Sequence, residues 1–161
     1  MNYRREKAVA YAHQWAFARN PRYYNFDDIG GDCTNFISHC LYAGLPVMNY
    51  TPDLGWFYIS PQRRSAAWSG VPYLYNFLTA NKGPGPFGKE MALDKAQPGD
   101  ILQLSFDGSV WSHSLLITGT GERPDPLNIT VSTHTFDADD RPLYTYTYSA
   151  CRLLHILGGR E

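Results

Sequence analysis

The sequence predicts an α+β fold in which N-terminal helices pack on an antiparallel sheet. Apolar residues recur at helical spacing in the first half of the chain, over residues 4–19 and 32–43. After residue 97 the pattern changes to short runs of β-branched and aromatic residues, separated by Gly, Pro and Asp. No internal repeat is visible, and a chain of 161 residues is long enough to bury one sizeable core. We therefore expect a single domain over residues 1–161.

Three helices are expected in the first half of the chain. The first covers residues 4–19, ends before Pro21, and has an apolar stripe made of Ala8, Tyr11, Ala12, Trp15 and Ala18. The second runs from residue 32 to residue 43, and Gly44 is its stop signal. The third covers residues 71–81, with Pro72 in its first turn. Residues 45–70 are expected to form loops.

The second half is expected to supply the sheet. Residues 83–86, Gly-Pro-Gly-Pro, are a cluster of breaking residues and predict irregular structure. Short strands are predicted at residues 101–104, 113–118, 129–135, 144–148 and 152–157. Consecutive strands after consecutive helices indicate the α+β class rather than a parallel sheet with alternating helices.

Composition excludes several classes of protein. The formal net charge of −1, with scattered Arg and Lys, argues against a nucleic-acid-binding protein. No segment approaches the roughly 18 apolar residues of a membrane span. The N-terminus lacks an apolar signal segment, so we expect a cytoplasmic protein or an excised domain of a secreted one. Twelve Tyr and four Trp suit a Tyr-rich sheet or an aromatic-walled cleft for peptide or glycan. The oligomeric state stays open.

The sharpest local feature is a cysteine that opens the second helix directly after a Gly-rich turn. Residues 30–36 have the sequence Gly-Gly-Asp-Cys-Thr-Asn-Phe. A thiol in the first turn of a helix faces the positive end of the helix dipole, which lowers its pKa and favours the thiolate. The unpaired N–H groups there also stabilise an oxyanion. Cys33 is therefore the candidate nucleophile, and a buried structural cysteine is the alternative.

The candidate base is His113, at the start of an apolar strand. A turn at residues 98–100, Pro-Gly-Asp, leads into the preceding strand. We expect His113 to face the helix that bears Cys33, to take the proton of the thiol and to pass it to the leaving amine. A structural histidine at this position is the alternative.

A third polar residue is expected to orient the imidazole of the base. His134, on the strand that follows, is the candidate for this role. Asp137 and Asp139 are close in sequence and take its place if His134 faces away. A half-exposed histidine without a catalytic role is the remaining alternative.

Four further residues are candidates for substrate binding. Asp32 either braces the Gly-rich loop or contacts a cationic group of the substrate. Asn35, on the first turn of the helix, faces either the cleft or solvent. Tyr24 offers a hydroxyl group from the loop before the nucleophile. Trp111, two residues before the candidate base, is the best candidate for a wall of the cleft.

These segments resemble those of two related families. Residues 32–36 are similar to the Asp-Cys-Ser-Gly-Phe signature of the NlpC-type cell-wall peptidases, which belong to the papain-like superfamily. Residues 98–100 and 113–117 are similar to their Pro-Gly-Asp and His-Val-Gly-Ile segments. A closer resemblance is to the bacterial "putative amidase domain" family, whose Gly-Gly-Asp-Cys-Thr-Asn-Phe segment stands intact at residues 30–36. Its first helix likewise ends in Arg-Asn-Pro, here residues 19–21.

The resemblance covers residues 3–157 and implies a papain-like fold of the NlpC/CHAP type. It implies hydrolysis of an amide bond through a thioester, without a metal or cofactor. The substrate stays open, because peptidoglycan stem peptides, other peptides and small amides all suit an aromatic-walled thiol cleft. The resemblance also implies the roles given above for Cys33, His113 and His134. Two departures matter. Thr34-Asn35 replace the Ser-Gly of the NlpC-type signature, so substrate choice need not transfer, and the secretion signal of a wall hydrolase is absent.

Three other functions compete with hydrolysis. A zinc site has enough ligand types, at Cys33, His39, Cys40, His113 and His134, but these residues form no close Cys-x-x-Cys or His-x-x-x-His pair. A catalytically inactive papain-like module would bind peptide or glycan in the aromatic-lined cleft. The presence of both a candidate nucleophile and a candidate base argues against this second alternative. Transfer of the acyl group to an amine instead of water stays open.

Overall fold

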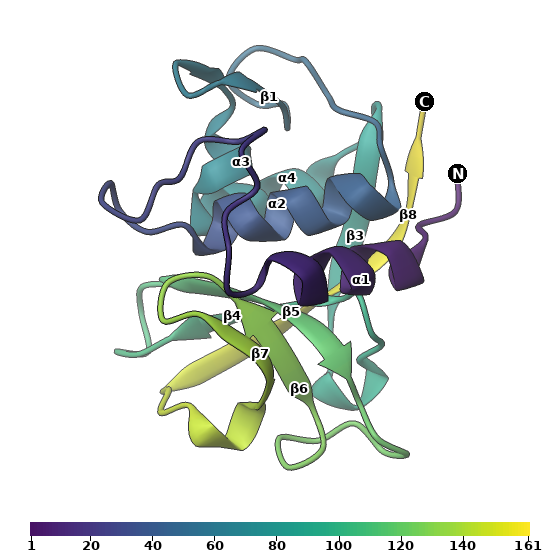
Figure 1. Ribbon diagram of the computed structural model, residues 1–161. Helices are drawn as coiled ribbons and strands as arrows, with labels where there is room; N and C mark the ends of the chain where they lie inside the picture. Colours follow the sequence, from purple (N-terminus) through teal and green to yellow (C-terminus); the bar gives the residue numbers. More distant parts are fainter.

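The computed structural model describes residues 1–161 and confirms the α+β class. A layer of helices covers one face of a six-stranded antiparallel sheet whose strand order is β3-β8-β4-β5-β6-β7 (Figure 1). The helices are α1 (Arg5–Trp15), α2 (Cys33–Gly44), α3 (Ala66–Ser69) and α4 (Val71–Ala80). The sheet consists of β3 (Gly85–Met91), β4 (Ile101–Ser105), β5 (His113–Gly119), β6 (Thr130–Thr133), β7 (Ala138–Pro142) and β8 (Ala150–Arg160). A separate hairpin is formed by β1 (Tyr58–Ser60) and β2 (Arg63–Arg64).

Most of the predicted elements are present. The three predicted helices correspond to α1, α2 and α4, although α1 ends at Trp15 because the chain turns over the next residues. Four of the five predicted strands correspond to β4, β5, β6 and β8. The short helix α3 and the β1–β2 hairpin lie in the segment that was expected to form only loops.

Two predictions about the sheet are wrong. Residues 83–86 do not exclude regular structure, because β3 begins at Gly85 and contains Pro86. Proline is tolerated there because β3 is an edge strand, whose outer side needs no backbone donor. The strand predicted at residues 144–148 is instead a 3-10 turn at Leu143–Thr145. The strand lies earlier, at β7, whose mostly charged and partly buried residues lack the apolar alternation of a half-buried strand.

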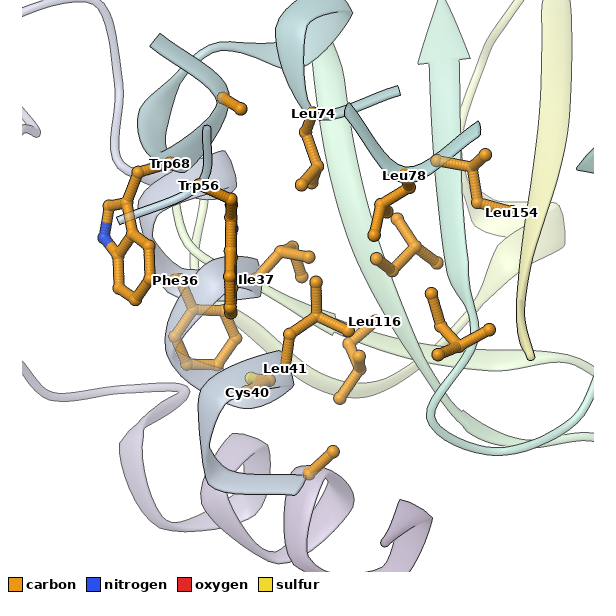
Figure 2. Close-up of a cluster of buried hydrophobic side chains, with 14 of the residues drawn as sticks. Phe36, Ile37, Cys40, Leu41, Trp56, Trp68, Leu74, Leu78, Leu116 and Leu154 are labelled. Atoms are coloured by element: carbon orange, nitrogen blue, oxygen red, sulfur yellow. The ribbon is translucent and has the colours of Figure 1, made fainter. Parts of the chain in front are cut away.

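Two apolar clusters stabilise the two faces of the sheet. The helix-side cluster includes the ten residues labelled in Figure 2: Phe36, Ile37, Cys40, Leu41, Trp56, Trp68, Leu74, Leu78, Leu116 and Leu154. The second cluster, on the opposite face, consists of Ala96, Leu102, Leu104, Leu115, Ile117, Ile129, Val131, Leu143 and Leu153. Leu115 and Leu116 fall in different clusters because successive side chains of a strand point to opposite faces.

The contact between α2 and β5 positions the candidate site. The hydroxyls of Thr34, in the first turn of α2, and Ser114, the second residue of β5, are hydrogen-bonded at 2.9 Å. Both residues are buried. The N-terminus of α2 is therefore fixed beside the start of β5.

The two ends of the chain lie side by side (Figure 1). The N-terminal ammonium group donates a hydrogen bond to the Gly159 carbonyl at 2.8 Å. None of the helices combines the length and the apolar character that a membrane span requires.

Candidate functional site

The Gly-rich turn before α2 needs glycine for two reasons. Gly30 and Gly31 have φ values of +81° and +96°, in the left-handed region that disfavours other residues. A Cβ atom on Gly31 would lie 2.9 Å from Oγ1 of Thr135, which is too close for an ordinary contact. The same hydroxyl accepts a hydrogen bond from the backbone N–H of Asp32 at 3.0 Å. Glycine thus lets the turn that precedes α2 pack closely against the end of β6.

Asp32 braces this turn and does not cap the helix. Its buried carboxylate accepts hydrogen bonds from the Phe26 backbone N–H at 2.8 Å, the Asn35 amide at 2.9 Å and the His134 ring at 2.6 Å. Burial alone would raise the pKa of this carboxyl, but the hydrogen bonds, led by that from His134, outweigh burial and lower it. No side chain caps α2, so the first N–H groups of the helix keep no side-chain partner.

His134 is buried, and both of its ring nitrogens have partners. Nδ1 lies 2.6 Å from the Asp32 carboxylate and Nε2 lies 2.8 Å from the Trp15 carbonyl. Both partners are oxygen acceptors, so each ring nitrogen faces an atom to which an N–H can donate. The ring also stacks on Phe36, with 4.0 Å between centroids. The expected contact with His113 is not present in this structure, and His134 instead links α1 to the N-terminus of α2.

The thiol of Cys33 lies at the first position of α2, between that helix and β5. The residue is 7% exposed, and Sγ lies 3.8 Å from the hydroxyl of Thr34. Burial raises the pKa of the thiol, although the backbone N–H of Ser114 and the Thr34 hydroxyl act in the opposite direction. This direction is opposite to the lowered pKa expected from the helix dipole alone. The resting thiol therefore keeps its proton at neutral pH.

His113 lies one residue from the strand position that contacts Cys33, but its side chain occupies the other face of the sheet. It pairs in register with Leu104, which belongs to the second cluster. Its ring lies 6.2 Å from the Tyr146 ring, between centroids. Burial and then the nearby Arg141 charge lower its pKa to about 4, so the imidazole is neutral at neutral pH.

The expected orientation of His113 toward α2 is therefore not what the structure shows. Ser114 faces the helix, and no hydrogen bond joins the His113 ring to Cys33. The thiol and the imidazole instead lie on either side of the first residues of β5, with the Ser114 N–H against the sulfur. Catalytic hydrogen bonds are often long in the absence of substrate and close only when it binds.

The imidazole of His113 opens into a pocket of about 420 Å³. Its lining consists of Phe106, Ser112, His113, Thr135, Phe136, Arg141, Thr145, Tyr146 and Thr147. Thr135 connects this pocket to the Gly-rich turn before α2, because its hydroxyl accepts the Asp32 N–H. The lining residues that were not predicted from the sequence include Phe106, Phe136, Arg141 and Tyr146. The signal that could have been used was the hairpin turn between β6 and β7. The strand predicted over residues 129–135 extended into this turn and concealed it.

The other candidate binding residues lie outside this pocket. Asn35 is buried, and its amide bonds the Tyr24 carbonyl, the Asp32 carboxylate, the His39 ring and the Trp68 indole. The Tyr24 ring packs edge-on against Phe26. These contacts give Asn35 a role in positioning the loop before Cys33.

The remaining candidates also have partners elsewhere. The indole of Trp111 lies under the guanidinium of Arg152, 4.2 Å away. The carboxylate of Asp137 pairs with Arg19 at 2.9 Å, and that of Asp139 pairs with His13 at 2.8 Å. Neither aspartate reaches the His113 ring.

The five residues considered for zinc do not gather in the structure. The group whose ligand atoms lie within 4.8 Å of one another is His13, Asp139 and Asp140, at the surface between α1 and β7. Two of these atoms already form the His13–Asp139 ion pair, and Asp139 also accepts a hydrogen bond from Ser132 at 2.6 Å. This group therefore ties a helix to the sheet edge.

Comparison with known proteins gives one family and one curated relative. The sequence model of the family described as "putative amidase domain" matches residues 2–156. The relative, described as the uncharacterized protein YhbB of Bacillus subtilis (strain 168), is 30% identical over 138 residues. The matched region is 84% of this chain and 42% of the relative, so the chain spans less than half of that protein. No solved structure gives a significant match.

Proposed function

Because the chain belongs to the "putative amidase domain" family, we propose that it hydrolyses an amide bond with Cys33 as the nucleophile. The observation that carries the proposal is the placement of Cys33 at the uncapped N-terminus of α2, beside the strand that begins with His113. We propose with it a papain-like fold of the NlpC/CHAP type, with a peptide or peptidoglycan stem peptide as substrate. The order of helix, nucleophile and antiparallel sheet supports this.

The proposed reaction starts from a neutral thiol and a neutral imidazole. Substrate binding must first bring the His113 imidazole, which in this structure lies on the opposite face of β5, to the thiol. His113 then takes the thiol proton as the sulfur attacks the carbonyl carbon and a C–S bond forms. The imidazolium then protonates the nitrogen as the C–N bond breaks, which releases the amine and leaves a thioester on Cys33. Water, deprotonated by the same imidazole, hydrolyses the thioester to a carboxylic acid and restores the thiol.

The N-terminus of α2 supplies the donors for the oxyanion that forms on the carbonyl. The backbone N–H of Cys33 and its neighbours have no side-chain cap, because the Asp32 carboxylate is turned toward the preceding loop. Donors fixed by the backbone stabilise developing negative charge without a cost of reorganisation. In this proposal His134 and Asp32 are positioning residues, since they hold the turn and act on the substrate only through it.

The test is covalent labelling by an N-acetyl-alanyl vinyl sulfone, an electrophilic peptide analogue, followed by peptide mapping. Cys151 is more exposed than Cys33, so simple accessibility would favour Cys151. The proposal predicts selective labelling of Cys33 and a loss of roughly 100-fold in its rate in His113→Gln, in line with the contribution of a general base. The matched control Cys151→Ala should keep the full rate.

Labelling of Cys151 in preference to Cys33 would contradict catalysis. Labelling of Cys33 at the same rate in His113→Gln as in the unchanged protein would contradict it too. Either outcome would favour the inactive module that binds peptide or glycan. The observation in its favour is the missing hydrogen bond between the thiol and the imidazole. If Cys33 is selectively reactive, product analysis with and without an added amine separates hydrolysis from acyl transfer.

A further inference from the structure

Arg141 is a cation without an acidic partner at the wall of the His113 pocket. Its Nε donates to the Thr145 hydroxyl at 2.7 Å and its Nη2 donates to the Thr145 carbonyl at 3.1 Å. No carboxylate lies within ion-pair distance of it, whereas Arg5 and Arg19 both pair with aspartates. The guanidinium is thus held in place by one neighbour while Nη1 keeps no partner within the protein.

Tyr146, which also lines this pocket, supplies a second donor. Its hydroxyl is the one buried side-chain polar atom in the chain that lacks a hydrogen-bond partner. Such groups are rare, because an unpaired buried hydroxyl has lost its hydrogen bonds to water. The Arg141 guanidinium lies 3.8 Å from the centre of the Tyr146 ring. Burial raises the pKa of the Tyr146 phenol, and the nearby Arg141 guanidinium acts in the opposite direction, so the two donors are close neighbours.

The pocket around these donors suits an anion. None of its lining residues is acidic, and Arg141 is the fixed positive charge among them. Phe106 and Phe136 add apolar walls, although they are 51% and 86% exposed. A carboxylate matches a guanidinium and a hydroxyl because its two oxygens accept charge-assisted hydrogen bonds from both.

We propose that Arg141 and Tyr146 bind a carboxylate that the substrate carries within about one residue of its scissile amide. The inference rests on the proposed function, because only a hydrolase has a scissile amide. It names the substrate class as acyl amino acids or short peptides with a free carboxylate. His113 lines the same pocket, so a carboxylate held there places the adjoining amide beside the imidazole.

The test is NMR titration of the ¹⁵N-labelled protein with N-acetyl-alanyl-alanine and, separately, with its C-terminal amide. The free carboxylate should bind about tenfold or more tightly than the amide, as expected for charged hydrogen bonds. The shifted backbone signals should surround residues 135, 141 and 146. Arg141→Gln should abolish the preference, Arg141→Lys should restore part of it, and Tyr146→Phe should reduce it.

Arg123→Gln is the matched control, since Arg123 is exposed and forms no ion pair. It should leave the preference unchanged. Equal binding of the two peptides, or a preference that survives Arg141→Gln, would overturn the inference. Release of free alanine, followed in one-dimensional ¹H spectra of the same samples, reports hydrolysis separately. Carboxylate binding without hydrolysis would therefore contradict the proposed function alone. Hydrolysis at the same rate for the free acid and the C-terminal amide would contradict the subsite alone.

Discussion

Burial sets the protonation states of single residues at the candidate site. It raises the pKa of the Cys33 thiol and lowers that of the His113 imidazole to about 4. It also lowers the pKa of His39, which stacks on Tyr23 at 3.7 Å between ring centroids, to about 3. The helix dipole is visible in the sequence, but the depth at which the thiol is buried is not. The sequence therefore led to the wrong direction for the pKa of Cys33.

The pKa of His113 makes stability depend on pH. In the unfolded chain this imidazole takes up a proton as the pH falls through about 6.5, whereas in the folded protein it does so only near pH 4. The unfolded state therefore binds more protons between these values, and the free energy of unfolding should fall as the pH falls from 6.5 to 4. Urea unfolding at pH 7.5, 5.5 and 4.5 measures this loss.

His113→Gln removes the titrating group and should make the loss of stability with falling pH smaller. NMR titration of the histidine ring signals supplies a direct check, and Arg141→Gln should raise the pKa of His113 because a nearby positive charge is gone. An unchanged pH slope in His113→Gln would contradict this account of the residue.

The Asp32–His134 pair gives a second prediction for single residues. His134→Phe keeps an aromatic ring against Phe36 but removes both donors and leaves the Asp32 carboxylate buried without its closest partner. Breaking a buried charged pair from one side costs about 3–5 kcal/mol, so the free energy of unfolding should fall by that amount. Urea unfolding at pH 7 measures it.

His13→Phe is the control for this prediction, because His13–Asp139 is a His–Asp pair with side chains 40% and 23% exposed. Solvent screens such a pair, and its loss should cost about 1 kcal/mol or less. Equal losses of unfolding free energy in the two variants would show that the buried His134–Asp32 pair stabilises the fold no more than the exposed His13–Asp139 pair does.

At the scale of elements, the turn between β6 and β7 is strained. Thr135 and Phe136 have φ values of +61° and +60°, in the left-handed region that suits Gly or Asn. A β-branched residue there is an outlier. Each side chain nevertheless makes a defined contact. The Thr135 hydroxyl accepts a hydrogen bond from the Asp32 N–H, and Phe136 lines the pocket. Strain retained at such a turn points to a functional role.

Phe136→Asn tests the cost of this turn. Asparagine tolerates the left-handed conformation, so the free energy of unfolding should rise by about 1 kcal/mol. The same change removes an apolar wall and should weaken the binding of N-acetyl-alanyl-alanine. Phe106→Asn is the control, because Phe106 lines the same pocket without a positive φ, and it should weaken binding without stabilising the fold. A Phe136→Asn protein with a lower free energy of unfolding would contradict the interpretation that this turn is strained.

Sequence predicts the helices and the inner strands well, because each carries a continuous apolar face. It also predicts the position of Cys33, since two glycines, a cysteine and a helical pattern follow one another directly. It cannot tell whether His113 or Ser114 faces α2. Leu115 and Leu116 are both buried, so β5 has no polar alternation, and a shift of one residue would exchange its faces.

The weakest predictions concern the edge strands and the pocket. β3 and β7 are edge strands with proline or charged residues, and their pairing depends on neighbours far away in the chain. Arg141 and Tyr146 are only five residues apart and meet across the 3-10 turn at Leu143–Thr145. The sequence predicted a strand over this segment, so it did not bring the two side chains together.

At the scale of the whole molecule, the two apolar clusters share one sheet. Leu115 and Leu116 are adjacent and fully buried, but they lie in clusters on opposite faces. Leu115→Ala and Leu116→Ala should each lower the free energy of unfolding by about 2–5 kcal/mol, as truncation of buried leucines does. If the domain is one cooperative unit, tryptophan fluorescence and far-UV circular dichroism should shift together in both variants.

Trp56 and Trp68 report mainly on the helix side of the sheet, where their rings lie 4.7 Å apart between centroids. A Leu115→Ala protein that loses its circular dichroism at lower urea than its fluorescence would contradict a single unit. Cooperativity matters for the site because Cys33 belongs to the helix layer, whereas the His113 side chain lies on the opposite face.

Amide hydrolysis as proposed requires that the Cys33 thiol and the His113 imidazole act as a pair across the start of β5. A crystal structure of the protein labelled by N-acetyl-alanyl vinyl sulfone would show whether they do. We expect an S–C bond to Cys33 and a His113 ring nitrogen within hydrogen-bonding reach of the sulfur or of the attached amide. An imidazole that stays turned into the pocket, with no contact to the sulfur or the adduct, would contradict it.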